Sequence, residues 1–348
     1  MDSARRAAIL RRMYGSAQCL PELPDIDLAL VHALQVAPRA PWSAIARTLG
    51  VDPATAARRW DRLVEERLAW FVVRPSAEQL APDRDGVLLK LRCRPGAEAR
   101  VGERIAAVPE VYAVDLLAGD DDLAVVLIGR GIATMRQTVE ELVASDPDIV
   151  RTRMYFLAEV HREDGQWQLD VLTEEQRSGL ARPRTGPATP PDAETLEKVT
   201  QILREDPRMS VADIGRRLDK PEPTARRLLE RVLSSGALRL GCDVVASAGG
   251  AGRAVLLEVC TDDPHAAGRV IGAERPVLRC AAVIGPANLA LVARFASLDA
   301  VYDLETRAAA NIPGWRVRNR ATVVRSVKRQ GHVLDDDGRV VLDPYGAA

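Results

Sequence analysis

The chain carries an internal repeat, and this repeat constrains its fold more than any other feature of the sequence. Residues 51–59 read VDPATAARR and are echoed by DKPEPTARR at 219–227, with the prolines and the paired arginines in register. Further along, GDDDLA at 119–124 is echoed by GPANLA at 285–290. Self-similarity of this kind in a chain of 348 residues indicates two copies of one folding unit in tandem.

Each copy begins with three predicted helices. The spacing of the apolar residues predicts helices at 26–34, 44–49 and 53–66 in the first copy, and at 196–203, 211–218 and 221–234 in the second. Asp52 before Pro53 suits the N-cap and first position of the third helix, and Gly50 can supply the left-handed turn before it. Three helices with a tight turn before the third form a helix-turn-helix unit.

Each helical unit is followed by the order strand, helix, strand, strand, helix, strand. The first copy has predicted strands at 87–93, 111–117, 123–128 and 152–160, and helices at 97–107 and 134–144. The second has strands at 254–261, 277–283, 289–295 and 315–324, and helices at 264–273 and 298–309. This is the ferredoxin-like βαββαβ pattern. We therefore predict an α+β chain with two tandem copies of a winged-type helix-turn-helix followed by a ferredoxin-like module.

The predicted boundaries follow from composition and from the repeat. A segment rich in Pro, Gly, Arg and Thr separates the halves and is typical of a solvated linker. In chain order we expect an N-terminal tail at 1–24, a helix-turn-helix at 25–73, a ferredoxin-like module at 86–162, the linker at 178–192, a second helix-turn-helix at 193–240, a second module at 253–327 and a C-terminal tail at 328–348.

The composition limits the class of protein. The net charge is −1, from 48 basic and 49 acidic residues, so any nucleic-acid surface has to come from local segregation of charge. No apolar run is long enough to span a bilayer, so we expect no membrane segment. The 5 cysteines include no Cys-x-x-Cys pair, which indicates reduced thiols in a cytoplasmic protein. The 4 histidines lie far apart in the sequence, and we expect no metal site.

Taken together, these segments resemble the Lrp/AsnC (feast/famine) family of bacterial and archaeal transcription factors, over nearly the whole chain and twice. In the first copy the resemblance rests on Asp25 and Asp27, on Ile45-Ala46, on the run from Pro53 through Arg62-Leu63, and on Pro109-Glu110-Val111 followed by Gly119-Asp120-x-Asp122. The resemblance implies that the third helix enters the major groove of double-stranded DNA. It also implies that the α/β module pairs with another copy and binds a small effector, usually an amino acid. The two modules of one chain could pair with each other as a pseudo-dimer or pair across chains in a homo-oligomer.

The candidate DNA-binding residues lie on the two third helices. Arginine can contact phosphates or donate two hydrogen bonds to guanine, and threonine can bind phosphate. The alternative is a solvated helix face on which arginines pair with neighbouring acids such as Asp61 and Glu65. The repeat favours DNA contact. The predicted residues are Thr55, Arg58, Arg59, Arg62, Thr224, Arg226, Arg227 and Arg231.

The candidate effector residues are Gly119, Asp120 and Asp122, in the turn where the resemblance places the effector pocket. Glycine there can adopt a left-handed conformation or permit close backbone approach, and a carboxylate can accept hydrogen bonds from an amino group. The alternative is a simple polar turn. In the second copy, Pro286 stands at the position of Asp120, and Asn288 stands at that of Asp122. Asn288 could still bind a ligand, but the lost charge predicts that the second module serves mainly as a pairing surface.

An enzyme is one alternative, because siroheme decarboxylases of haem biosynthesis use an Lrp/AsnC-like fold and can occur as fused pairs. Their His-Asn-Tyr-type segment is missing, since 108–112 reads VPEVY and 275–279 reads RPVLR. The sequence shows neither a histidine there nor a clustered basic pocket for a polyanionic tetrapyrrole, and no other catalytic arrangement. We expect no catalytic residue and no cofactor. A sensor or scaffold whose helix-turn-helix units no longer bind DNA is a third possibility.

Overall fold

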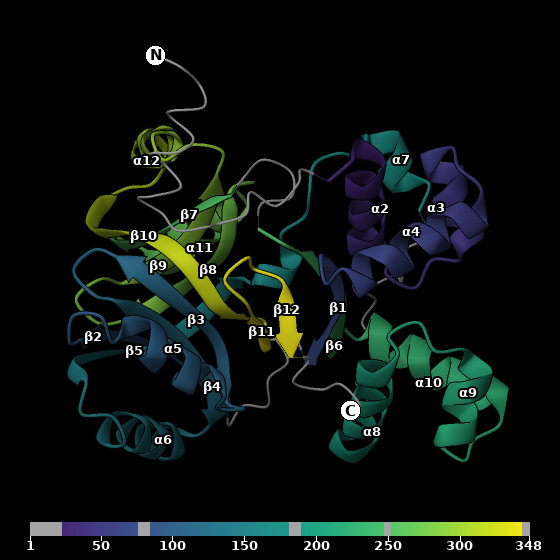
Figure 1. The fold of residues 1–348 in the computed structure, drawn as a ribbon, viewed down its shortest axis with the longest axis horizontal. Coiled ribbons are helices and arrows are strands. Elements are labelled where there is room, and N and C mark those ends of the chain that lie inside the picture. The colour runs from purple at the N-terminus through teal and green to yellow at the C-terminus, as the bar shows by residue number, and fades with distance from the viewer. Residues whose placement is uncertain (1–22, 76–83, 181–188, 247–251, 343–348) are drawn as a thin grey trace.

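The computed structural model describes residues 23–75, 84–180, 189–246 and 252–342. Two three-helix units occupy one side of the molecule, and the strands and helices of the α/β modules form the other (Figure 1). The two halves have the same order of elements from the first helix of each three-helix unit to the last strand of each module. Within the described residues, no helix is long and apolar enough to cross a membrane.

The first helical unit consists of α2 (Asp25–Val36), α3 (Trp42–Leu49), α4 (Pro53–Glu65) and strand β1 (Ala69–Pro75). Asp52 caps α4 by accepting a hydrogen bond from the amide of Ala54 at 2.8 Å. Gly50 adopts a left-handed conformation with φ 68°, which turns the chain between α3 and α4. The buried face of α4 carries Ala56, Trp60 and Leu63. The three helices and the tight turn before the third are therefore confirmed.

The second helical unit consists of α8 (Ala193–Glu205), α9 (Val211–Arg217), α10 (Glu222–Ser234) and strand β6 (Leu238–Val244). The predicted alignment of the two third helices is wrong by one residue. In α10 the buried positions are Ala225, Leu229 and Val232, which match Ala56, Trp60 and Leu63 of α4 at a spacing of 169 residues. The alignment made from the sequence used a spacing of 168 residues, because it matched Pro53 with Pro221.

Those prolines hold different positions at their helix starts. Pro53 is the first residue of α4, whereas Pro221 is the N-cap of α10. A proline fits both places because neither requires its missing N–H donor. The left-handed residue before each helix confirms the new alignment, since Asp219 (φ 52°) lies 169 positions after Gly50. Arg227, rather than Arg226, therefore corresponds to Arg58.

The six-element modules follow the predicted order closely. The first contains β2 (Arg84–Cys93), α5 (Glu98–Ala106), β3 (Val111–Ala118), β4 (Leu123–Arg130), α6 (Ile132–Ala144) and β5 (Ile149–Arg162). The second contains β7 (Arg253–Cys260), α11 (Pro264–Gly272), β8 (Val277–Ile284), β9 (Leu289–Phe295), α12 (Ala300–Asn311) and β10 (Arg316–Arg329).

The two modules join into one closed barrel. Within them the strands are ordered β3-β4-β2-β5 and β8-β9-β7-β10, and antiparallel pairing of β5 with β8 and of β10 with β3 closes the ring. One apolar core lies inside the ring and includes Leu88, Tyr155 and Leu256. Two further cores lie outside it, where α5 and α6 cover one module and α11 and α12 cover the other. An eight-stranded barrel of this kind is just wide enough to be filled by side chains.

Segments after each module add to the structure. After β5, the chain forms η2 (Asp164–Gln166) and α7 (Glu174–Ser178), and buried His32 of α2 accepts hydrogen bonds from the amides of Val171 and Leu172. The segment expected to be a C-terminal tail instead completes β10 and adds β11 (His332–Leu334) and β12 (Val340–Leu342). The alternating Val and Leu of these short strands were too few to indicate pairing in the sequence.

Candidate DNA-binding face and effector cavity

The four residues predicted on α4 divide into two groups. Arg58 is exposed and makes no hydrogen bond or ion pair with any described residue, and Thr55 is half-buried. Arg59 and Arg62 bind the carboxylate of Asp27 at 3.0 Å and 2.5 Å, and Asp27 is fully buried. These two arginines therefore hold α4 against α2, a role that the sequence did not indicate. Arg58 is thus the arginine of α4 that has no ion-pair partner among the described residues.

The residues predicted on α10 divide in the same way. Arg227 is exposed and makes no hydrogen bond or ion pair within the described part of the chain, and Thr224 is also exposed. Arg226 pairs with Glu222 at 2.7 Å on the helix surface. Arg231 donates to the carbonyl groups of Thr189 and Pro190 at 2.8 Å and 3.1 Å. Arg58 and Arg227 thus occupy equivalent positions on the two helices, and neither makes a hydrogen bond or ion pair with another described residue.

A reciprocal pair of arginines connects the two helical units. Arg39 donates to the carbonyl groups of Pro207 and Met209, and Arg208 donates to those of Pro38 and Ala40 at 2.5 Å and 2.7 Å. Arg208 also stacks on the ring of Trp42, 4.2 Å from its centroid. Burial lowers the pKa of both arginines.

The strands that follow the helices strengthen this connection. β1 and β6 form a two-stranded antiparallel sheet, with Ala69 opposite Val244 and Pro75 opposite Leu238. The pairing lies between the helical units (Figure 1). Together with the arginine pair, it joins the two helical units within a single chain, which is the pseudo-dimer arrangement that the sequence left open.

The predicted effector turn is closely tied to its own backbone. The Asp122 carboxylate accepts a hydrogen bond from the amide of Cys93 at 2.7 Å, and Asn288 makes two hydrogen bonds to Thr261, of 3.0 Å and 2.8 Å. Asp120 uses its carbonyl group to accept from Arg92 at 2.6 Å. The side chains of Asp122 and Asn288 therefore bind the backbone at the ends of β2 and β7 in the same way. The effector role of these residues stays a prediction.

Gly119 is required by close packing rather than by a left-handed backbone. A Cβ atom at this position would lie 3.0 Å from the Cβ of Ala321, on a strand of the other module. Gly285, the corresponding residue of the second half, would place a Cβ 2.3 Å from the ring of Tyr155. The two glycines let β3 and β8 approach the opposite module where the barrel closes.

The barrel interior holds an ion cluster that sequence reasoning missed. Lys90 is fully buried and binds the carboxylates of Asp121 and Glu258 at 2.9 Å and 2.6 Å. Asp121 also binds Arg151 and Arg153 at 3.1 Å and 2.5 Å. Burial alone would raise the pKa of Asp121, but Lys90 and Arg153 together lower it below its usual value. The sequence signal for this cluster is Lys90, which stands in the middle of the mainly apolar segment VLLKLRC.

Two cavities lie in and beside the barrel. One of about 80 Å³ is lined mainly by interior apolar residues such as Leu88, Leu256 and Val292. The other, of about 220 Å³, has a lining of mixed charge that includes the four arginines Arg279, Arg294, Arg325 and Arg329 and the five aspartates Asp115, Asp164, Asp335, Asp336 and Asp337. The arginines of this cavity are therefore matched by acidic side chains, and the expectation that the chain has no clustered basic pocket stays a prediction. These arginines come from β8, β9 and β10, which are all strands of the second module.

Arg294 differs from the other buried arginines of the larger cavity. Arg279 binds Asp164 at 3.1 Å and also Asp115, and Arg329 binds Asp243 at 2.8 Å. Among the described residues, no carboxylate lies within ion-pair distance of Arg294, whose guanidinium stacks on Trp167 at 4.8 Å. Burial, followed by the nearby Arg329, lowers the pKa of Arg294 to about 10. The cavity therefore contains a buried guanidinium that has no ion-pair partner among the described residues, although Asp115 and Asp164 line the same cavity.

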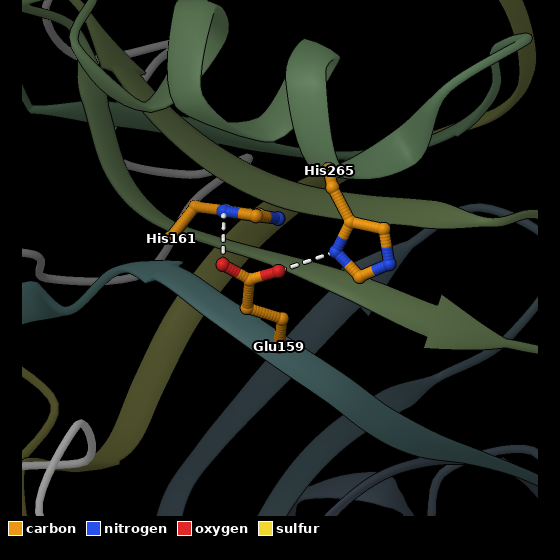
Figure 2. A group of neighbouring side chains, drawn as sticks. All are labelled: Glu159, His161 and His265. Atoms are coloured by element: carbon orange, nitrogen blue, oxygen red, sulfur yellow. Dashed lines mark hydrogen bonds and ion pairs between the residues drawn. The ribbon is translucent and has the colours of Figure 1, made fainter.

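The histidines also depart from expectation. His161 of β5 and His265 of α11 lie beside Glu159, so that two residues far apart in sequence share one carboxylate (Figure 2). The sequence could not show this grouping because it depends on the contact between the two modules. The described cysteines Cys93, Cys242, Cys260 and Cys280 are free thiols.

Comparisons with known proteins agree with the helix-turn-helix and ferredoxin-like elements of the first half. Residues 23–64 match the AsnC-type helix-turn-helix domain, and residues 87–167 match the Lrp/AsnC ligand binding domain. An uncharacterized HTH-type transcriptional regulator of Pyrococcus horikoshii is 32% identical over 109 residues, which cover 30% of this chain and 72% of the relative. The HTH-type transcriptional regulator AldR of Mycolicibacterium smegmatis is 28% identical over 145 residues, covering 40% and 82%. The chain belongs to the Lrp/AsnC family of helix-turn-helix transcriptional regulators.

Solved structures of one protein, the siroheme decarboxylase NirDL, resemble nearly the whole chain. The siroheme decarboxylase NirDL superposes with a TM-score of 0.51 and 14% identity, covering 92% of this chain and 96% of the other. At that identity the likeness concerns the fold alone. Both chains arrange their elements in a similar way over nearly their full lengths.

Proposed function

We propose that this chain is a sequence-specific, DNA-binding transcriptional regulator of the cytoplasm, built from two tandem family units that act as a pseudo-dimer. The observation that carries the proposal is the equivalence of Arg58 and Arg227. Both are exposed guanidinium groups at the same position of a third helix. In helix-turn-helix proteins that helix lies in the major groove, where arginine contacts phosphates or guanine.

The arginine pair between the helical units supports a defined operator. Arg39 and Arg208 each donate to two carbonyl groups of the other unit, so the two recognition helices have a fixed separation. Paired helix-turn-helix units bind half-sites whose spacing mirrors the spacing of the helices. We expect an operator with two half-sites, both bound by one chain.

DNA binding can be tested with fragments tiled across the chain's own gene neighbourhood, at two salt concentrations, by fluorescence anisotropy. We expect saturable binding to particular fragments, with an affinity that falls steeply as salt is added. In Arg58→Ala and Arg227→Ala, each lost phosphate contact should reduce the salt slope by about 0.9. Arg318→Ala is the matched control, since Arg318 is an exposed arginine on β10, outside the helical units. Equal binding by all four proteins would exclude this DNA-binding face.

We further propose that the α/β barrel senses a small carboxylate, with Arg294 as its anchor. The cavity of about 220 Å³ is suited to a molecule of amino-acid size. A carboxylate would neutralise a buried guanidinium that has no acidic neighbour at bonding distance among the described residues, and charged hydrogen bonds of this kind are strong. The ligand can alter DNA occupancy if it favours one arrangement of the two halves.

Calorimetric titration of the full chain with single amino acids tests this part of the proposal separately. We expect one class of amino acid to bind and to change the DNA affinity. Arg294→Met should abolish both effects while leaving DNA binding without ligand unchanged, and Arg318→Ala should preserve them. Ligand binding that survives in Arg294→Met would place the effector elsewhere, with the Gly119–Asp122 turn as the next candidate.

A siroheme-decarboxylase-like enzyme is the second candidate, favoured by the likeness of fold to NirDL over nearly the whole chain and by the four arginines that line the cavity together with aspartates. Cavities of about 80 Å³ and 220 Å³ are small for a tetrapyrrole, because even drug-sized ligands occupy roughly 300–1,000 Å³. Titration with an iron tetrapyrrole, followed by absorbance, separates the candidates. Saturable tetrapyrrole binding without specific DNA binding would favour the enzyme, and the absence of both would favour a scaffold.

A further inference from the structure

The contact between the two modules contains a group of metal-ligating side chains. Glu159 and His161 lie on β5 of the first module, and His265 lies near the start of α11 in the second (Figure 2). One ligand atom from each residue can be chosen so that all three lie within 4.8 Å of one another. The Glu159 carboxylate is central, with one oxygen 3.6 Å from Nδ1 of His161 and the other beside Nδ1 of His265. The three side chains converge from both halves of the chain.

His161 is held in place without a conventional hydrogen bond. Its side chain is 2% exposed, and its Nε2 atom has no hydrogen-bond partner in the described structure. Its Nδ1 atom is also too far from Glu159 for a good hydrogen bond. A buried imidazole of this kind loses the hydrogen bonds it would make with water. Burial lowers the pKa of His161, which favours the neutral imidazole that metals bind.

Helix α11 packs closely against the imidazole of His161. A Cβ atom on Gly268 of α11 would lie 1.9 Å from Cδ2 of His161 and 2.4 Å from its Nε2. The carboxylate of Asp263 caps α11 by accepting from the amides of His265 and Ala266, at 3.0 Å and 2.9 Å. The glycine makes room for one histidine, and the cap fixes the backbone of the other.

The equivalent contact on the other side of the barrel lacks these side chains. The pairing of β10 with β3 matches that of β5 with β8, which places Arg325 at the position of Glu159 and Val327 at that of His161. There Gly102 of α5 faces Val327, as Gly268 faces His161. Arg325 instead forms an ion pair with Glu103 at 3.2 Å. The histidine group is therefore a specific feature of one contact rather than a consequence of the barrel.

We propose that Glu159, His161 and His265 bind a divalent transition-metal ion of the zinc class, which links the two halves of the chain. Two imidazole nitrogens and a carboxylate oxygen are common zinc ligands, at about 2.0–2.2 Å from the metal. Imidazole ligands also disfavour Mg²⁺ and Ca²⁺, which prefer oxygen. Glu159 and His265 are half-exposed, so the ion has a route from solvent and an open position for water. The bound ion stabilises the pairing of β5 with β8 and leaves the DNA-binding helices unchanged.

The test uses the full chain, stripped of metal with a chelator and titrated with ZnCl₂ by calorimetry. We expect one ion per chain and a higher Tm with zinc. Replacing zinc by Co²⁺ should give the visible absorption of a site with nitrogen and oxygen ligands. Because His265 is half-exposed, His265→Ala should fold normally and bind zinc at least tenfold more weakly. Glu159→Gln should show the same loss.

Cys260→Ser is the matched control for binding to a thiol, because Cys260 is a partly exposed cysteine of the same module. It should bind zinc as the parent does. Unchanged zinc affinity in both His265→Ala and Glu159→Gln would overturn the proposal, as would loss of binding in Cys260→Ser. Weak binding by the parent, with no rise in Tm at a tenfold excess of zinc, would show an adventitious ion only.

Discussion

Lys90 and Glu258 occupy equivalent positions in the two halves of the chain and form an ion pair of 2.6 Å across the inside of the barrel. Lys90 lies on β2 and Glu258 on β7, which are on opposite walls of the closed ring. In a dimer of two identical halves, the same positions would bring two lysines or two glutamates together. The two halves are therefore complementary in charge at this position. Pairing of the first half with the second is more favourable here than pairing of either half with a copy of itself.

The first prediction concerns this pair. Glu258→Gln should lower the free energy of unfolding by about 3 kcal/mol, because removal of one partner leaves a buried charge poorly compensated. The double substitution Lys90→Met and Glu258→Met should recover most of that loss, since Asp121 retains Arg151 and Arg153. Urea unfolding of the parent, Lys90→Met, Glu258→Met and the double variant measures the coupling. Additive losses would show that the pair contributes nothing as a unit.

The second prediction separates the structural arginines of α4 from the arginine proposed to bind DNA. The double variant Arg59→Ala and Arg62→Ala leaves Asp27 buried without a cation, which should cost about 3–5 kcal/mol of stability. Arg58→Ala should change stability by less than about 0.5 kcal/mol, because Arg58 is exposed and makes no ion pair within the described structure. Thermal and urea unfolding provide the measurement. A stability loss in Arg58→Ala equal to that of the double variant would contradict this division.

The third prediction concerns the reciprocal pair Arg39 and Arg208. The double variant Arg39→Gln and Arg208→Gln removes the two guanidinium groups that donate hydrogen bonds to four backbone carbonyl groups. We expect it to bind a single half-site as the parent does, but to lose discrimination between operators of different half-site spacing. Binding to a series of fragments with inserted base pairs tests this. A preserved spacing preference would assign the separation of the helices to β1 and β6 instead.

The fourth prediction is a pH dependence that arises from Lys328. This lysine is buried on β10 and donates to the carbonyl group of Val108 at 2.8 Å, and burial lowers its pKa to about 8 against a weaker opposing effect of Glu110. The usual pKa of lysine is about 10.4. Between these values the folded chain has released a proton that the unfolded chain still holds, so this group makes stability rise with pH.

Below about pH 8, the folded chain carries the full cost of a buried ammonium group. Lys328→Met should therefore be more stable than the parent at pH 7, and the advantage should shrink as the pH rises from 8 toward 10. Urea unfolding of both proteins at several pH values measures the difference, in which the other titrating groups cancel. A constant difference across this range would show that Lys328 titrates normally.

Most secondary structure could be predicted from the sequence, because it depends on local patterns. The turn at Gly50, the cap at Asp52 and the twelve elements of the modules each leave a signal within a few residues. The alignment of α4 with α10 was wrong for a local reason as well, since proline is accepted at two positions of a helix start. The buried positions of α4 and α10, which only the folded structure shows, give the correct alignment.

The groups that depend on barrel closure could not be predicted. Arg279 and Arg294 interrupt apolar strands, which indicates inward charges, but their partners Asp164 and Trp167 come from the other half of the chain. Glu159 and His265 are likewise 106 residues apart and meet only where β5 contacts the second module. The sequence marks Asp27 only by its position at the start of a helix. Its role as the ion-pair partner of Arg59 and Arg62 depends on the packing of α4 against α2.

The closed ring also determines how the assembly responds to dilution. In a regulator made of two separate chains, pairing is a second-order process, and the paired fraction falls as the protein becomes scarce. Here both contacts that close the barrel, β5 with β8 and β10 with β3, join segments of one polypeptide. Their association is first-order, with an effective concentration set by the connecting chain. A cell holding only a few copies of this protein would therefore hold every copy already paired.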